Sequence, residues 1–333
     1  MLVSRDPEVR TVLRMNEDHW SGHTPQVTEI IYTPITEAAT RVAALLAGDV
    51  DFVQDVPVQD IARLEQTAGI TVTTGPENRN IFFAYDMTSE RLQSASVDGN
   101  PFADPLVREA MALDRDAIRQ VVMRGQSLPS AAPLPPFVNG WTEEMDAYGP
   151  PDIERATELM AEAGYGDGFS VDFHCPNDRY LNDEAICTAF VGMLGRIGIN
   201  ANLVAQTRTI HFPLIQNEEV DLYLLGWGVP TFDSQYVFDF LVHTKEGARG
   251  GWNGSRYSNP EADALIQAMA TETDLDARNG MIADVWQMVM NDRVFLNVHN
   301  QLLAYATRDG WSIEVHPENQ PNMWEATFTG TGN

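Results

Sequence analysis

The stretch Val220–Ser234 constrains the fold of this chain more than any other. Its first half, Val220–Leu225, is a run of mostly apolar residues without regular alternation. Such a run is typical of a strand that is buried on both faces, as in a parallel sheet. A Gly-Trp-Gly triplet follows it, and Pro230 cannot continue a hydrogen-bonded ladder. We therefore expect a buried strand that ends at Trp227.

Trp227 is the first candidate binding residue. Open α/β sheets bind ligands beyond the C-terminal ends of their strands, and Gly226 and Gly228 would leave the face of the indole uncovered. The alternative is that Trp227 is a core aromatic residue beside a tight turn. Downstream, Asp233 or Ser234 is placed to cap a helix at 235–241.

Strands and helices alternate along the chain, which predicts an α/β fold. A helix at 37–47, capped by Thr36 and ended by Gly48, joins strands at 27–32 and 50–53 into a β-α-β unit. A strand at 70–74 is expected to break at Gly75-Pro76. Further strands are expected at 80–87, 169–174, 199–205, 294–298, 302–307 and 311–315, and helices at 57–66, 105–113, 115–124, 152–163, 181–196, 209–216, 260–270 and from 274 onward.

The composition limits the possible partners. The chain of 333 residues has a net charge of −27, so its surface repels nucleic-acid backbones and anionic lipid headgroups. We expect neither nucleic acid nor membrane as a partner, and no apolar run approaches the ~20 residues of a membrane span. Cys175 and Cys187 lie twelve positions apart and could bridge, but we interpret each as a small buried apolar residue.

The sequence shows none of the common catalytic motifs. No Gly-x-Gly-x-x-Gly, Walker-type loop or nucleophile elbow is present. His19 and His23 are four positions apart, but the glycine and proline around them make a helix improbable, so we interpret them as exposed loop residues rather than a metal pair. We expect no catalytic residues, no metal ligands and no cofactor.

Several short motifs in this order resemble those of the family 5 extracellular solute-binding proteins of ABC importers, the peptide/nickel-binding group. The matching segments are NEDHW at 16–20, RVAALLAGDVD at 41–51, FADPLVREA at 102–110 with DR at 114–115, AEAGY at 161–165, LGRIGI at 194–199, LGWG at 225–228 and YSNP at 257–260. They cover nearly the whole chain. The resemblance implies a periplasmic-binding-protein-like fold of type II, cluster C, with two lobes and a cleft between them.

The resemblance also implies a domain organisation. Family members are about half as long again on the N-terminal side, where the secretion signal and much of the first lobe lie. We therefore expect 1–76 and 308–333 to be the remainder of lobe I and 77–307 to be lobe II, with crossings near 75–80 and 299–307. Gly75-Pro76 is a candidate hinge. The complete protein would be a monomer in the periplasm or another extracytoplasmic compartment.

By family position, Arg179 and Tyr180 are candidates for contact with the carboxylate end of a ligand. The alternative is that Arg179 is a solvated loop arginine. Arg208, after the next strand, is a weaker second candidate. The neighbours of Trp227, namely Gly228, Phe232 and Asp233, complete the expected ligand-binding set.

One position departs from the family pattern. Peptide binders in the family have an aspartate shortly after the tryptophan that pairs with the α-amine of the ligand, and Pro230 stands there in this chain. Asp233 could substitute, or it could only cap a helix. We therefore predict a ligand that is not a plain di- or oligopeptide, or one that is held differently.

The resemblance implies the substrate-binding component of an ABC importer, which captures a peptide-like or other small organic solute and delivers it to a membrane permease. Three alternatives remain open. One is uptake of nickel or a metal chelate, which also occurs in this family. The second is an enzyme on the same scaffold, for which the sequence shows no acid/base pair. The third is a remnant that does not bind a solute.

Overall fold

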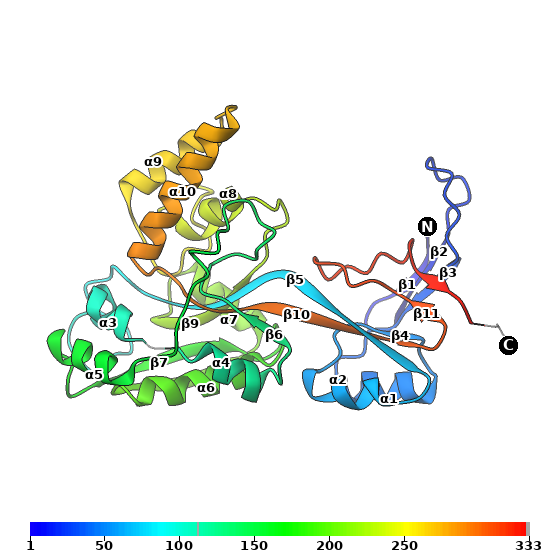
Figure 1. Ribbon diagram of the computed structural model, residues 1–333, viewed down its shortest axis with the longest axis horizontal. Coiled ribbons are helices and arrows are strands. Elements are labelled where there is room, and N and C mark those ends of the chain that lie inside the picture. Colours follow the sequence, from blue (N-terminus) through cyan, green and yellow to red (C-terminus); the bar gives the residue numbers. More distant parts are fainter. Residues whose placement is uncertain (112, 331–333) are drawn as a thin grey trace. The chain divides into compact units, whose positions relative to one another are not determined.

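The computed structural model describes residues 1–111 and 113–330, and these form two compact units (Figure 1). Unit 1 comprises residues 1–77 and 302–333, and unit 2 comprises residues 78–301. The sequence analysis placed the lobe boundaries after residues 76 and 307, whereas the units change after residues 77 and 301. The first predicted boundary is therefore one residue early and the second is six residues late. The assignment of the units to lobes stays a prediction.

Unit 2 is built on most of a seven-stranded mixed sheet of order β4-β10-β5-β9-β7-β8, with β6 (Ser127–Pro129) also paired to β10. The strands β5 (Ile70–Tyr85) and β10 (Leu296–Arg308) each run from one unit into the other. The strand β9 (Leu222–Trp227) is parallel to β7 (Phe169–Pro176), and β7 is parallel to β8 (Ile199–Gln206).

The apolar run at Val220–Leu225 therefore leads into a buried strand, β9, but only one of the two neighbours of β9 is parallel. On its other side β9 is antiparallel to β5, with Asn80 opposite Trp227. Residues 222–226 are all buried. The absence of alternation predicted burial on both faces correctly, because burial depends on the layers above and below a strand and not on the direction of its neighbours.

Helices cover the sheet of unit 2 on both sides. In Figure 1, α6 runs along one side of β7 and β9, and the paired helices α9 and α10 lie on the other. The helices of unit 2 are η1 (Pro101–Ala103), α3 (Pro105–Ala110), α4 (Arg115–Ala117), η2 (Ile118–Val122), α5 (Ile153–Glu162), α6 (Asp183–Gly195), α7 (Arg208–Gln216), α8 (Ser234–Val237), η3 (Phe238–Val242), α9 (Pro260–Met269) and α10 (Leu275–Asn291). None of the helices within residues 1–111 and 113–330 is long and apolar enough to cross a membrane.

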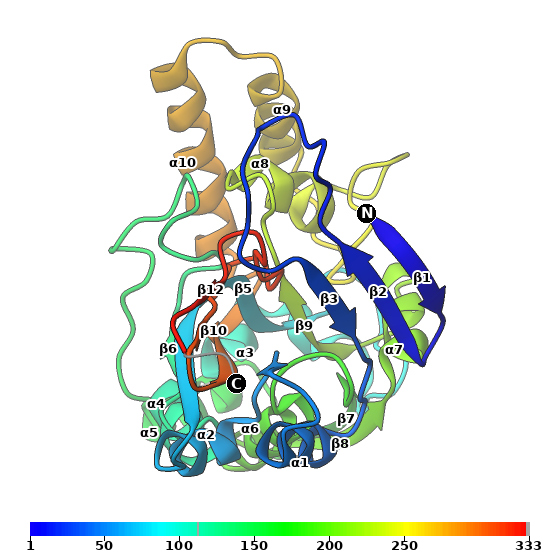
Figure 2. The ribbon, with the colours of Figure 1, turned by 90° about the vertical axis from the view of Figure 1, so that its right-hand side faces the viewer.

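Unit 1 has a small sheet of its own. Figure 2 shows β1 (Leu2–Asp6), β2 (Arg10–Arg14) and β3 (Glu29–Tyr32) side by side, and all are antiparallel. The unit also contains α1 (Ala38–Ala47), β4 (Phe52–Val53), α2 (Val58–Glu65), β11 (Trp311–Ser312) and β12 (Thr327–Phe328). One buried cluster of this unit is formed by Leu303, Tyr305, Ile313 and Ala326, against which Val27, Phe52, Val315 and Met323 pack.

The predicted helix starts depend on side-chain caps, and most are confirmed. The side chains of Asp104, Asp114, Asp152, Asn259 and Asp274 each accept a hydrogen bond from a backbone N–H in the first turn of the helix that follows. The start at Thr36 is wrong, because the cap of α1 is Glu37 and it makes no side-chain bond. The predicted helix at 115–124 is instead the short helix α4 followed by the π-helix η2.

The predicted strand break at Gly75-Pro76 is also wrong. The strand β5 continues through both residues for 16 residues in all. A Cβ at position 75 would lie 2.9 Å from Cβ of Val315, so the glycine permits close packing. Pro76 removes a single N–H, which costs one ladder bond and does not end so long a strand. The strands predicted at 294–298 and 302–307 are likewise one strand, β10.

The two cysteines form a disulfide, which corrects their interpretation as separate apolar residues. Cys175, near the end of β7, is bonded to Cys187 in α6, and both are fully buried. The bridge closes a loop of twelve positions. Sequence spacing did not decide between the alternatives, because the turn after β7 brings the helix back against the strand.

We predict that loss of this bridge destabilises unit 2. Cross-linking a loop of this size adds about 2–3 kcal/mol to the free energy of unfolding, in part because it restricts the conformations of the unfolded chain. Urea unfolding of the Cys175→Ser/Cys187→Ser double variant should show that loss. Dithiothreitol should lower the stability of the wild type to the same level and leave the variant unchanged. Equal stability of the oxidised wild type and the variant would contradict the prediction.

His299 has a buried imidazole ring that makes no hydrogen bond to the described residues. It lies in β10, is 1% exposed, and neither ring nitrogen has a partner among the described residues. Burial lowers the pKa of His299 to about 3. The imidazole is therefore neutral in the folded protein and takes up a proton on unfolding at acidic pH.

We predict that His299 makes the protein less stable as the pH falls. The folded pKa of about 3 lies below the ordinary value of 6.5, so between these values the unfolded chain binds the additional proton. One proton corresponds to a slope of about 1.4 kcal/mol per pH unit. In urea unfolding between pH 6 and 4, His299→Leu should reduce the slope of stability against pH by up to that amount. An unchanged slope would disprove this role.

Candidate functional site

The candidate site forms where β9 ends beside the part of β5 that belongs to unit 2. Asn78, which is 4% exposed, holds the chain just after β9. Its Nδ2 donates to the carbonyl of Val229 at 2.7 Å, and its Oδ1 accepts from the N–H of Val229 at 3.3 Å. The buried amide thus satisfies both backbone groups of one residue and fixes the turn that follows Trp227.

The glycines on either side of Trp227 make room for neighbouring groups. A Cβ at Gly226 would lie 2.6 Å from Cδ1 of Ile81 and 2.7 Å from the ring of Tyr180. A Cβ at Gly228 would lie 2.8 Å from the backbone oxygen of Asn78. The space beside each glycine is filled, and the expectation that the glycines leave the face of the indole uncovered stays a prediction.

Trp227 belongs to a cluster of aromatic rings. Its ring centroid lies 5.8 Å from Tyr236, 5.8 Å from Phe240 and 5.7 Å from Trp252, and Trp252 lies 5.3 Å from Phe212. All five side chains are only partly buried. The indole Nε1 is buried and has no hydrogen-bond partner among the described residues. Such a donor is costly to leave unpaired, which makes it a candidate contact for a bound acceptor.

Tyr180 connects this cluster to two arginines. Its hydroxyl donates to the carbonyl of Gly226 at 3.1 Å. The guanidinium carbons of Arg179 and Arg79 lie 5.1 and 5.7 Å from the centre of its ring. Burial raises the pKa of Tyr180, although both arginines and the bond to Gly226 act against this shift. The phenol thus stays neutral and serves as a rigid surface for two cations.

The loop that carries Arg179 is anchored by a carboxylate. Asp183 accepts hydrogen bonds from the N–H groups of Arg179, Tyr180 and Glu184, each at 3.0 Å. Asp183 is 5% exposed. These bonds hold the backbone of the two predicted ligand contacts directly before α6.

The structure brings four of the seven predicted site residues together: Arg179, Tyr180, Trp227 and Gly228. It adds Arg79, which the sequence analysis missed. Arg79 precedes Asn80, the strand partner of Trp227, and only the pairing of β5 with β9 places it beside the ring of Tyr180. No local pattern around position 79 indicates this.

Asp233 is engaged within the protein. Its carboxylate caps α8 by accepting from the N–H of Gln235. It also accepts two hydrogen bonds from Arg278, at 2.8 and 2.7 Å, and one from Asn139 at 3.1 Å. Burial raises its pKa, but the bonds from Arg278, Asn139 and the cap outweigh it, and the net shift is downward. The interpretation of Asp233 as a helix cap is confirmed, and its role as an ammonium anchor is no longer proposed.

The side chains of the two remaining predicted residues have no described contact with the aromatic cluster or with Tyr180, although the N–H of Phe232 donates to the carbonyl of Val229 at 2.8 Å. Phe232 is 41% exposed and its ring lies 5.9 Å from that of Phe137. Arg208 is exposed, and its backbone N–H donates to Asp178 at 2.6 Å. We therefore place neither of them in the centre of the candidate site.

The histidines of the N-terminal loop were predicted to be exposed; His23 is exposed, whereas His19 is partly buried. Both His19 and His23 contact the ring of Trp324, at centroid distances of 4.5 and 5.1 Å. Within residues 1–111 and 113–330 there is no group of three or more His, Cys, Asp or Glu side chains that could hold a metal ion.

Comparison with known protein families identifies the chain. Residues 1–249 match the model of the bacterial extracellular solute-binding proteins, family 5 (middle). The chain belongs to this family. Its α/β fold is that of periplasmic binding proteins of the family 5 type, as the sequence motifs predicted.

The similar proteins are longer than this family 5 chain. The glutathione-binding protein GsiB of Salmonella paratyphi A is 22% identical over 319 residues, which are 94% of this chain and 58% of that protein. The heme-binding protein A of Haemophilus influenzae is 26% identical over 288 residues, 85% of this chain and 50% of that protein. The chain thus spans about half the length of these relatives.

A solved structure shows the same fold. The dipeptide-binding protein of Pseudoalteromonas in complex with Met-Leu aligns with a TM-score of 0.79 and 21% identity. The alignment covers 99% of this chain and 64% of that one.

We predict that a methyl group at Gly226 disturbs the site. Gly226→Ala places Cβ against Ile81 and the ring of Tyr180, and overpacking of this kind costs about 1–3 kcal/mol. Chemical denaturation measures the loss. The matched control is Gly192→Ala in α6, where nothing lies within 4 Å of the added Cβ. There the variant should gain up to about 1 kcal/mol from helix propensity. Equal effects of the two variants would contradict the packing described.

Proposed function

We propose that this chain is part of the substrate-binding component of an ABC importer, which captures a small organic solute bearing a carboxylate and delivers it to a membrane permease. Family membership supports the general role. The observation that carries the choice of solute is that the guanidinium groups of Arg79 and Arg179 both lie beside the ring of Tyr180, whose hydroxyl is bonded to Gly226 next to Trp227.

The chemistry of the site suits an amphiphilic solute. The partly exposed rings of Trp227, Tyr236, Phe240 and Trp252 offer an apolar surface. A guanidinium binds a carboxylate through two parallel hydrogen bonds, which fixes its orientation as well as its charge. The unpaired indole N–H of Trp227 supplies one further donor for an acceptor atom of the solute.

The site offers little for an α-ammonium group. Pro230 stands where peptide-binding members of the family have an aspartate, and the carboxylate of Asp233 is already bonded to Arg278, Asn139 and the first turn of α8. We therefore propose a solute other than a plain dipeptide, or one whose amine contributes little to affinity.

The remaining aspects of the role follow from the same proposal. The protein acts as a binding protein and not as an enzyme, and it needs no cofactor. It works as a monomer in the periplasm or an equivalent extracytoplasmic compartment, where the bridge between Cys175 and Cys187 is stable.

We predict that affinity depends on Arg179 through the carboxylate of the solute. A thermal-shift screen against peptides, glutathione, sugar acids and metal chelates first selects a bound compound, because a ligand that binds only the folded state raises its stability. Calorimetric titration then compares this compound with its amidated analogue. Arg179→Gln should weaken binding of the free acid by about 10- to 100-fold, the effect of losing a charged hydrogen-bonded pair.

The amidated analogue provides the internal control. It should bind the wild type as weakly as the free acid binds Arg179→Gln, and the variant should not weaken it further. Arg155→Gln, on the surface of α5 where its partners are Glu158 and Glu162, should leave both affinities unchanged. If the free acid bound Arg179→Gln as tightly as it binds the wild type, the proposal that Arg179 binds the carboxylate would be wrong. The proposal that the protein binds a solute would not be affected.

A further inference from the structure

Unit 2 contains a pocket of about 790 Å³ next to the helices α3 and α5. These two helices lie side by side (Figure 1), and residues of both line the pocket together with the C-terminal turn of α10 and the residues that lead into β10. All of the lining residues belong to unit 2, and none of them belongs to the candidate solute site. A pocket of this size can hold a small organic molecule.

The floor of the pocket is part of the buried core. At most 4% of Met111, Leu113, Leu159 and Val289 is exposed, although all four line the pocket. Phe295 is partly buried and adds an aromatic ring. Side chains that are packed in this way hold a fixed apolar surface, against which the apolar part of a ligand can be removed from water.

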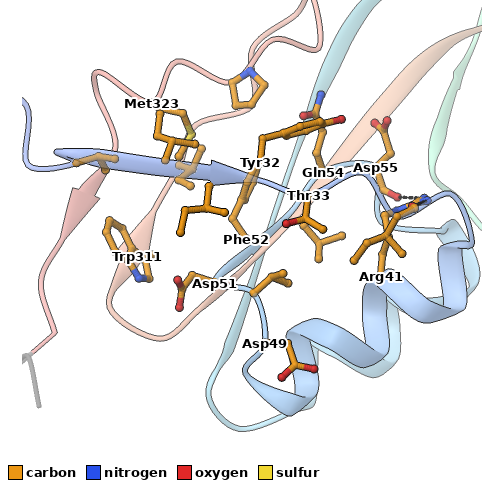
Figure 3. Close-up of a pocket in the computed structure, with 18 of the residues that line it drawn as sticks. Tyr32, Thr33, Arg41, Asp49, Asp51, Phe52, Gln54, Asp55, Trp311 and Met323 are labelled. Carbon is orange, nitrogen blue, oxygen red and sulfur yellow. Dashed lines mark hydrogen bonds between the residues drawn. The ribbon is translucent and has the colours of Figure 1, made fainter. Parts of the chain in front are cut away.

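The charged residues of the pocket have the opposite balance to the protein as a whole. The chain has 21 lysine and arginine residues against 48 aspartate and glutamate residues. The pocket is lined by the four arginines Arg108, Arg115, Arg155 and Arg293 and by the two acidic residues Glu109 and Asp152. By contrast, four acidic residues and one arginine line the pocket of about 610 Å³ in unit 1 (Figure 3). The pocket of unit 2 therefore favours an anion.

The acidic residues of the unit 2 pocket are already engaged. Glu109 pairs with Arg293 at 2.9 Å. Asp152 is the N-cap of α5 and accepts a hydrogen bond from the N–H of Arg155. The side chain of Arg155 pairs with two glutamates of its own helix. These contacts leave the other two arginines of the pocket without a carboxylate from its lining.

Arg108 and Arg115 form no ion pair with any residue in 1–111 and 113–330. Arg108 is fixed by backbone carbonyls, since its Nε donates to Asp292 and its Nη1 donates to Phe102 and Ala103. Its Nη2 makes no hydrogen bond to a described residue and is not buried. One edge of this guanidinium is thus open.

Arg115 presents the more open group. Its Nε donates to the carbonyl of Asn297 at 2.8 Å and to that of Ser130 at 3.1 Å. Its guanidinium carbon lies 5.3 Å from the centre of the ring of Tyr148. Neither Nη1 nor Nη2 bonds to a described residue, and neither is buried. The two nitrogens therefore offer the parallel N–H donors that bind a carboxylate or a phosphate group.

The charge of Arg115 is only partly compensated by the protein. Burial lowers its pKa, while Tyr148 and Asp146 act in the opposite direction to a smaller extent. The carboxylate of Asp146 itself accepts hydrogen bonds from the hydroxyl of Ser130 and from two backbone N–H groups. A bound anion would therefore stabilise a guanidinium that has lost part of its contact with water.

We propose that this pocket is a second binding site, which takes a small organic anion. The carboxylate or phosphate group of the anion binds Nη1 and Nη2 of Arg115, and its apolar part lies on the floor of the pocket. Arg108 offers a further cation to a ligand with a second acidic group. The site shares no residue with the proposed solute site, so either site can bind without the other.

Calorimetric titration of the Arg179→Gln variant tests the proposal, because this variant lacks the proposed carboxylate contact of the solute site. The probes are 3-phenylpropionate and phenyl phosphate, and at least one should bind with a Kd of about 1 mM or lower. The tighter of the two shows whether the site prefers a carboxylate or a phosphate. The uncharged 3-phenylpropionamide should bind about tenfold more weakly than the tighter probe or weaker still, because it lacks the charged pair.

Two further substitutions in the same background locate the binding. Arg115→Gln should weaken it about tenfold. Because that change also removes the bonds of Nε, Gly149→Leu serves as a second variant that keeps them. Gly149 lines the pocket and a Cβ there meets nothing within 4 Å, so the larger side chain should obstruct the site and weaken binding about tenfold. Arg63→Gln, on α2 of unit 1 where the partner is Asp60, is the control and should have no effect.

Three outcomes would overturn the proposal. The first is that neither probe binds to the Arg179→Gln variant. The second is that the amide binds as tightly as the charged probes, which would mean that the pocket recognises only the apolar part. The third is that binding is unchanged in Gly149→Leu and in Arg115→Gln that circular dichroism shows to be folded, which would place the bound probe elsewhere.

Discussion

The antiparallel pairing of β5 with β9 is the constraint on which the candidate site depends. It places Asn80 opposite Trp227. Asn78, two residues before Asn80, then fixes the turn that follows the tryptophan. It also brings Arg79 to the ring of Tyr180, whose hydroxyl is bonded to the carbonyl of Gly226. A shift of β5 by one residue against β9 would turn the side chains of β5 to the opposite face of the sheet and separate these groups.

The polar groups around the site divide into those that hold the scaffold and those that remain for a ligand. The carboxylates of Asp183 and Asp233 both accept hydrogen bonds from the protein. Asp183 accepts from three backbone N–H groups, and Asp233 accepts from Arg278, Asn139 and the first turn of α8. The indole N–H of Trp227 is buried and unpaired. Carboxylates that are held by these hydrogen bonds keep their position, which supports the proposal that cationic and aromatic groups make the main contacts with a solute.

Both units contain strands with open edges, and in unit 2 the edge strand is β8. In unit 2, β9 has a partner on each side, and β10 is paired to β5 and β6. In unit 1, β3 and β4 end their sheets on either side of a pocket. Open strand edges promote association with other chains.

Local patterns in the sequence determined the α/β class, most helix starts and the buried strand that ends at Trp227. Each of these follows from interactions within a few residues, such as the cap formed by Asp274 or the uninterrupted apolar run of β9. The motif order also predicted the family. Long-range packing decided the rest: the bridge from Cys175 to Cys187, the continuity of β5 through Pro76 and the place of Arg79. These features arise because segments far apart in the chain are brought into contact, and no local pattern carries that information.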